Sequence, residues 1–212
     1  MRHAILQSGE SRSFPAGDPF LAAAVPAAEA DVVVHLGTPL AEHSGKAAVL
    51  VELGTESLGV HTGESMGGEG STVLGFARWR NGDDPPSPLV ELVRQPATAD
   101  AAIAAARAVF EAAGLTVVVS ADQAGRILDR LVRPKYNAAL RLLDEGLATQ
   151  ADLDLTCKLG LGYPDGPVER VVRGGLAHHH DVTRALFETH GTAGYAPARR
   201  AVVAAQRRDR SG

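Results

Sequence analysis

The chain has 212 residues, of which 45% are hydrophobic and 22% charged, and this balance excludes a disordered or fibrous protein. A formal net charge of −4 leaves no basic footprint for nucleic acid, and no stretch approaches the roughly 20 apolar residues that a membrane span needs. Since only 4% of the residues are aromatic, a base-stacking surface for single-stranded nucleic acid would also be hard to assemble.

One cysteine, Cys157, excludes an internal disulfide. Polar residues 7–13 lie where a signal peptide would need its apolar run. The sequence therefore predicts a cytoplasmic protein with neither nucleic acid nor a membrane as partner.

The first half predicts strands separated by loops. Residues 30–36 and 47–53 are short Val-rich runs, typical of strands buried on both faces of a parallel sheet. Residues 71–79 and 89–94 predict two further strands, and the Gly- and Pro-rich segment 81–88 between them predicts a surface loop. The few aromatic residues indicate a core of Ala, Val and Leu.

A strand–helix–strand unit completes this half. A helix is expected from Thr98 to about Ala113, with Gly114 ending it, and residues 115–120 predict the next strand. Together with the strand before the helix, this spacing is typical of a parallel βαβ unit.

From Asp122 onward the apolar residues recur with helical period. Residues 126–145 predict a long helix that contains Pro134, and Thr149 is the expected N-cap of the next helix. A glycine-rich turn leads to Pro167 at a first helical position, and two more helices are expected at 182–190 and 197–208. The predicted fold class is α/β plus α: a Rossmann-like parallel-sheet domain at 1–122 and an all-helical domain at 123–212.

Local glycine and cysteine features indicate little chemistry of their own. No G-x-G-x-x-G motif follows an early strand, so the usual dinucleotide fingerprint is lacking, and MGGEG at 66–70 favours a flexible loop over a phosphate cradle. Cys157 has no neighbouring thiol or imidazole and is expected to be a small buried side chain rather than a nucleophile.

Two clusters of charged or titratable side chains can each be interpreted as structural or as a binding site. His178, His179 and His180 point about 100° apart if helical, which favours a solvated turn or helix start over a metal site, although a metal-binding regulator with distant ligands stays an alternative. The C-terminal arginines favour a helix terminus, with an anionic ligand such as a coenzyme A phosphate as the alternative; they are Arg199, Arg200, Arg207, Arg208 and Arg210.

Residues 124–169 read AGRILDRLVRPKYNAALRLLDEGLATQADLDLTCKLGLGYPDGPVE. This run resembles the C-terminal domain of the 3-hydroxyacyl-CoA dehydrogenase family, with its long helix, its E-G-x-A-[ST]-x-x-D-[IL]-D segment and its K-L-G-x-G-x-P-x-G-P turn. The likeness continues backward, more faintly, to about residue 30. The resemblance implies a Rossmann-type domain, a helical domain that mediates dimerisation, and NAD as cofactor for hydride transfer at C3 of a hydroxyacyl thioester.

The resemblance also implies site residues, and this chain departs from most of them. Ala77 in GFARW stands where the family has its general-base His, while the Glu that orients this His is retained as Glu91. Glu56 stands at a substrate-contacting Ser, where a carboxylate would repel the thioester oxygen, and Asp129 replaces the Asn of G-F-x-x-N-R-[LI]. The resemblance implies no metal-ligating residues.

Other side chains are poor replacements for the missing base. Arg78 cannot be deprotonated in a protein, and His35 and His61 are more readily read as packing or surface residues than as surrogates. We therefore expect a catalytically degenerate relative in fatty-acyl-CoA metabolism. It would bind an acyl-CoA-type molecule between its domains, or pair with itself or with a full-length paralogue. The alternative is an active NAD-dependent 3-hydroxyacyl-CoA dehydrogenase with unusual site residues.

Overall fold

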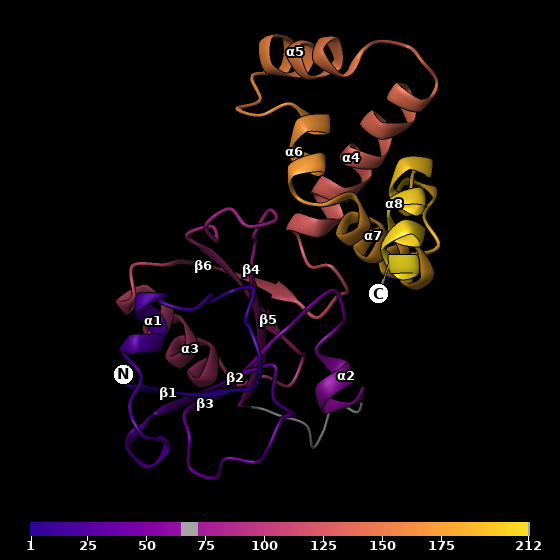
Figure 1. Cartoon of the computed structure of the whole chain (residues 1–212). Coiled ribbons are helices and arrows are strands. Elements are labelled where there is room, and N and C mark those ends of the chain that lie inside the picture. Colours follow the sequence, from indigo (N-terminus) through magenta and orange to yellow (C-terminus); the bar gives the residue numbers. More distant parts are fainter. Residues whose placement is uncertain (65–71, 212) are drawn as a thin grey trace. The chain divides into compact units, whose positions relative to one another are not determined.

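The computed structural model describes residues 1–64 and 72–211. This part of the chain divides into two compact units (Figure 1). The first unit comprises Met1–Arg80 and Pro85–Arg126 and holds the strands, and the second comprises Asn81–Asp84 and the chain from Ile127 onward. The domain division expected between residues 122 and 123 stays a prediction.

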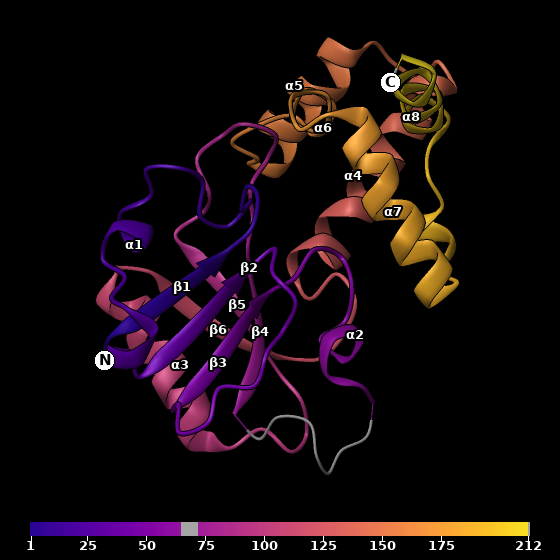
Figure 2. The same cartoon turned by 60° about the horizontal axis from the view of Figure 1, so that its bottom comes forward.

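The strands form one six-stranded sheet in which spatial order follows chain order (Figure 2). They are β1 (His3–Gln7), β2 (Val32–Leu36), β3 (Ala48–Glu52), β4 (Val73–Arg78), β5 (Leu89–Arg94) and β6 (Thr116–Ala121). Neighbouring strands are parallel, except that β4 and β5 are antiparallel. Antiparallel neighbours can be joined by a direct return of the chain, and the segment between β4 and β5 makes that return. The parallel sheet is thus confirmed except at this pair.

Helix α3 (Asp100–Ala112) joins β5 to β6, which confirms the βαβ unit. It packs on one face of the sheet together with a cluster of aromatic rings. Phe14 stacks on Phe20 with ring centroids 4.2 Å apart, and Phe76 and Phe110 lie 5.3 Å apart. The expected core of Ala, Val and Leu is therefore incomplete, because four of the five phenylalanines gather at one point.

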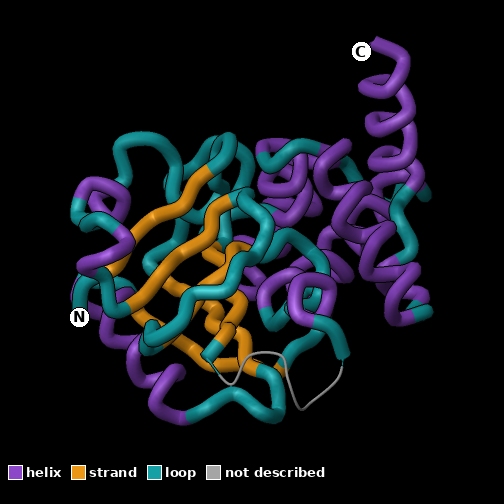
Figure 3. The backbone as a smooth tube through the Cα atoms, turned by 90° about the horizontal axis from the view of Figure 1, so that it is seen from below, coloured by secondary structure: helices purple, strands orange, loops and turns teal. Residues whose placement is uncertain are grey.

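Short helices complete the first unit: α1 (Pro19–Ala22), α2 (Gly59–Thr62) and the 3-10 turn Ala27–Glu29. The second unit is helical (Figure 3). It holds α4 (Leu128–Asp144), α5 (Gln150–Leu161), α6 (Pro167–Arg173), α7 (Leu176–His190), the 3-10 turn Ala193–Tyr195 and α8 (Arg199–Ser211). Its core gathers around Tyr136, Leu140, Val168 and Val171.

The glycine-rich turn between α5 and α6 has a structural role. Thr149 caps α5 by accepting a hydrogen bond from the Asp152 N–H at 3.2 Å, as predicted. The buried Asp154 carboxylate accepts from the N–H groups of Val168 and Glu169, at 2.8 and 3.0 Å, and so caps α6. A Cβ atom on Gly166 would collide with the Asp154 side chain. This turn of the family-like motif therefore builds a helix junction.

The histidine run lies in the first turns of α7, which agrees with the expected helix start, but its central residue is buried rather than solvated. His179 is buried because its ring packs edge-on against Tyr136, with centroids 5.8 Å apart. Among the described residues, no group of three or more His, Cys, Asp or Glu side chains could hold a metal ion. No helix in this part of the chain is long and apolar enough to cross a membrane.

Candidate functional site

Ala77, where the resemblance implies a missing base, lies in the antiparallel pair of strands. Ala77 on β4 is directly opposite Glu91 on β5, and both side chains are buried. Directly opposed residues point to the same face of a sheet, so an imidazole at position 77 would stand beside the Glu91 carboxylate. At this place the chain offers a methyl group.

A residue that the sequence reasoning missed, Arg126, faces Glu91 instead. Its Nε lies 3.6 Å from Glu91 Oε2, and both side chains are about 5% exposed or less. The guanidinium also donates to the Gly54 carbonyl at 2.8 Å. Arg126 has φ 49°, a backbone conformation that favours glycine. The signal was present in GRILDRL, where Arg126 stands at the aromatic position of G-F-x-x-N-R.

Glu56 is paired with His61, one of the two surrogates considered from sequence. His61 Nε2 lies 3.2 Å from Glu56 Oε1, and the Gly54 N–H donates to the same oxygen at 3.0 Å. Burial by itself raises the pKa of Glu56. The hydrogen bonds from its own N–H, from Gly54 and from His61 outweigh that effect, so its pKa lies below the ordinary value. The structure thus contains a carboxylate–imidazole pair, but not at Ala77.

His35, the other surrogate, is buried at the carboxyl end of β2 and bonded on both ring nitrogens. Its Nδ1 lies 2.9 Å from Thr38 Oγ1, which itself donates to the Leu6 carbonyl, so Nδ1 must be the donor. Its Nε2 then accepts from His43 Nε2 at 2.9 Å. Burial and, after it, the neighbouring His43 lower the pKa of His35. His35 is therefore part of a hydrogen-bonded chain within the sheet unit.

A pocket of about 420 Å³ opens in the sheet unit beside α2. His43 and His61 both line it, together with apolar Leu40 and Val49 and the hydroxyl of Thr62. Each imidazole is held by a partner, His35 and Glu56 respectively. This pocket could host proton transfer, but neither Ala77 nor Glu91 lines it.

Asp129 lies in the helical unit within a buried polar network. Arg133, one turn later on α4, donates to its carboxylate at 2.7 Å and to His179 Nδ1 at 3.4 Å. His179 Nε2 then donates to Asn137 Oδ1 at 2.9 Å. Burial, followed by the charge of Arg133, lowers the pKa of His179 to about 3, so the ring is neutral. Asp129 therefore forms an ion pair with Arg133 within the helical unit.

Two other sequence-derived expectations concern Cys157 and the terminal arginines. Cys157 is only partly buried, so the expected full burial of this residue is not found. Arg200 and Arg208 pair with Asp144 and Asp181, at 2.5 and 2.6 Å. Arg208 lies in the last turn of α8, as a favourable cation placement requires. An anionic ligand for this cluster stays a prediction.

The comparisons with known proteins identify the helical unit. The family model of the 3-hydroxyacyl-CoA dehydrogenase C-terminal domain matches residues 125–211. This part of the chain is therefore a C-terminal domain of the 3-hydroxyacyl-CoA dehydrogenase family. A probable 3-hydroxyacyl-CoA dehydrogenase of Caenorhabditis elegans is 41% identical over 81 residues, which are 38% of this chain and 26% of that protein. The mitochondrial hydroxyacyl-coenzyme A dehydrogenase of Homo sapiens is 36% identical over 88 residues, 42% of this chain and 28% of the human protein.

Solved structures extend the likeness to the sheet unit. FadB2 of M. tuberculosis matches with a TM-score of 0.72 at 21% identity, covering 84% of this chain and 66% of that one. The (S)-3-hydroxybutyryl-CoA dehydrogenase PaaH1 from Ralstonia eutropha matches with a TM-score of 0.69 at 22% identity, covering 81% and 64%. At these identities the likeness shows the fold, a mostly parallel sheet followed by helices. The chain spans less than two thirds of the relatives that it matches.

The described residues do not fit NAD in the manner of a dehydrogenase of this fold. Dinucleotides bind where the strand order of a doubly wound sheet reverses, and the order from β1 to β6 contains no reversal. The only helix between β1 and β2 other than a 3-10 turn is the four-residue α1, too short to offer an aligned dipole to a pyrophosphate. The glycine-rich segment 66–70 lies outside the described residues.

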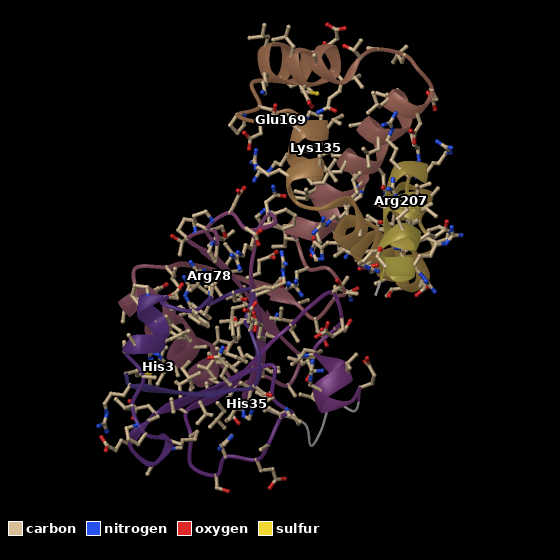
Figure 4. All side chains as sticks on the ribbon, in the orientation of Figure 1. His3, His35, Arg78, Lys135, Glu169 and Arg207 are labelled. Carbon is tan, nitrogen blue, oxygen red and sulfur yellow. The ribbon has the colours of Figure 1, made fainter. Side chains whose placement is uncertain are left out.

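The chain itself occupies the carboxyl end of β3 and β4. Ser11 Oγ and the Ser13 N–H both donate to Glu52, the last residue of β3, at 2.8 Å. Arg78, the last residue of β4, donates to the Ser13 carbonyl and pairs with Asp18 at 2.9 Å (Figure 4). Ligands of open α/β sheets collect outside these strand ends. The segment that follows β1 therefore fills part of the place where a cofactor would approach.

Proposed function

We propose that this member of the 3-hydroxyacyl-CoA dehydrogenase family does not by itself catalyse NAD-dependent hydride transfer, and that it binds an acyl-CoA-type molecule or acts as a dimerising scaffold in fatty-acyl-CoA metabolism. One observation carries the proposal: the Glu91 carboxylate faces a methyl group at Ala77 and is paired with Arg126. Loss of a general base typically lowers the rate by about 10²–10⁴-fold.

The surroundings of the cofactor position support the same proposal. Without a strand-order reversal and a helix N-terminus after β1, the affinity for a pyrophosphate loses its usual source. The proposal for NAD is therefore that this chain alone does not use it.

Exposed leucines in the helical unit support association with a second copy or a full-length paralogue. Leu155 and Leu159, one turn apart on α5, are 52% and 79% exposed, and Leu161 follows at 63%. A stripe of this kind is covered when two helical surfaces pack together. We propose a homodimer, or a pair with a full-length relative, formed through this face.

Titration of the purified chain with NADH and with acetoacetyl-CoA tests the proposal. We expect calorimetry to detect acetoacetyl-CoA but not NADH, and the nicotinamide absorbance to stay at the level of a buffer control. Turnover above that control would overturn the proposal. If neither molecule binds, acyl-CoA binding is excluded and the scaffold role remains to be judged by oligomeric state.

A second candidate is an active dehydrogenase that uses a different imidazole as base, and the Glu56–His61 pair favours it. This pair has the carboxylate–imidazole arrangement that Ala77 and Glu91 lack, and His61 lines a pocket. If turnover is found, His61→Gln should abolish it under this candidate. His43→Gln, which changes the other pocket imidazole, is the matched control and should retain most of the rate.

A further inference from the structure

The surface of the helical unit has a groove of about 350 Å³ beside α8. Apolar side chains line part of this groove: Leu176, at the start of α7, and Val203 and Ala204 on α8. Val203 is 41% exposed, so the apolar lining is open to solvent. A concave, partly apolar surface of this volume is large enough to hold a small molecule.

Three arginines of α8 complete the lining of the groove, namely Arg199, Arg200 and Arg207, of which Figure 4 labels the last. Arg200 is neutralised, because its Nε donates to the Asp144 carboxylate. Neither Arg199 nor Arg207 forms an ion pair with any residue that the structure describes. The apolar lining is therefore flanked by two guanidinium groups whose charge is not neutralised within the described part of the chain.

The start of α8 adds to this positive charge. Arg199 and Arg200 are its first two residues, and its first turn contains no acidic residue. The N-terminus of a helix carries a partial positive charge, which favours anions and disfavours cations. Arg208 and Arg210 lie in the last turn, where a cation is favourable. An anion bound in the groove would offset the unfavourable arrangement at the start of the helix.

We propose that this groove binds a single-chain amphiphile with an anionic head, either a carboxylate or a phosphate. The apolar chain lies against the lining formed by Val203, Ala204 and Leu176, and Arg199 and Arg207 supply the counter-charge for the head. A guanidinium group donates in a planar fork that matches both kinds of head. The proposal does not rest on the proposed function, because the ligand needs neither a thioester nor coenzyme A.

Calorimetric titration of the full chain with four small molecules tests the two parts of this site. Octanoate and octyl phosphate have both the chain and an anionic head, butyrate has the head with a short chain, and octyl glucoside has the chain without charge. All four are used below their critical micelle concentrations. We expect octanoate, octyl phosphate or both to bind at least about tenfold more tightly than butyrate and octyl glucoside. The comparison of octanoate with octyl phosphate identifies the preferred head, and either preference supports the site.

Three variants test which residues bind the amphiphile. Arg199→Gln combined with Arg207→Gln should weaken binding of the better ligand about five- to twentyfold. Val203→Ser makes the lining less apolar and should weaken binding about threefold. Arg210→Gln is the matched control, because Arg210 lies on the same helix but does not line the groove, and it should change the affinity less than about twofold. An unchanged thermal unfolding curve reports intact folding of each variant.

Several outcomes would overturn the proposal. Octyl glucoside that binds as tightly as octanoate would mean that the charges are not used, and butyrate that binds as tightly would mean that the apolar lining is not used. Absence of binding by both anionic amphiphiles, or an unaltered affinity in the folded double arginine variant, would also contradict the site. Acetoacetyl-CoA is titrated separately against the unaltered chain, so the proposed function can succeed or fail independently of these results.

Discussion

Two buried carboxylates at positions that the resemblance implies for the site are each paired with an arginine. Glu91 is paired with Arg126, and Asp129 with Arg133. A buried charge without a partner is strongly unfavourable, so a carboxylate can persist at such a position only with a cation beside it. Ala77 opposite Glu91 and Arg126 beside it therefore belong to one electrostatic arrangement.

Arg126→Ala should destabilise the fold by about 3–5 kcal/mol, because it removes the guanidinium that is paired with the buried Glu91 carboxylate. The free energy of unfolding in urea measures this effect. Arg107→Ala is the matched control, since it breaks an exposed Arg–Glu pair on α3 and should change stability by about 1 kcal/mol or less. Equal small effects of both variants would show that Glu91 does not depend on Arg126.

The neutral His179 should make stability depend on pH. Its pKa is about 3 in the folded chain against 6.5 in the unfolded one, so between these values the unfolded state binds the extra proton. Its contribution is complete above pH 6.5 and is lost as the pH falls, by about 2 kcal/mol at pH 5. Urea unfolding at pH 7 and pH 5 measures the loss. His179→Gln should reduce it, whereas His180→Gln should not; a loss that is the same in all three chains would contradict the assignment.

At the scale of elements, the α5–α6 junction depends on one capping carboxylate. Asp154→Ala removes the acceptor of two α6 N–H groups and should lower the free energy of unfolding by about 1–2 kcal/mol. Asp152→Ala, which alters an exposed residue of the first turn of α5, is the control and should have a smaller effect. Thermal unfolding of the two variants compares them directly. If Asp152→Ala has the larger effect, the junction is not held as described.

Elements with local signals were predictable from sequence, and those that depend on distant partners were not. Thr149 and Pro167 mark helix starts because capping and proline geometry act within one turn. The antiparallel pairing of β4 with β5 depends on the path of the segment that joins them. The spacing of hydrophobic residues along each strand does not reveal that path. At the site, Ala77 and Glu91 could be placed by resemblance. The roles of Arg126 and His179 required contacts over 35 and 42 residues, to Glu91 and Asn137.

At the scale of the whole molecule, the fold is similar to that of solved relatives such as FadB2, but the order of the six described strands in the sheet never reverses. The segment after β1 uses its polar groups to hold the chain's own strand ends, through Ser11, Ser13 and Glu52. Groups that bond within the protein are not available to a ligand at the same time. The packing of the sheet on α3 involves none of these groups, so the fold does not depend on a cofactor crevice at these strand ends.

Association through α5 is the remaining prediction at this scale. Burying a leucine side chain in an interface contributes about 1.5–3 kcal/mol relative to its exposed state, and symmetry doubles each contribution in a homodimer. Light scattering during size-exclusion chromatography should therefore give a dimer mass for the unaltered chain. Leu155→Glu with Leu159→Glu should give a monomer, because a dimer would then bury four unpaired carboxylates. Val60→Glu, at a residue of α2 that is 70% exposed, should remain dimeric. A monomer at every concentration, or a dimer that survives the double substitution, would contradict an interface on this face.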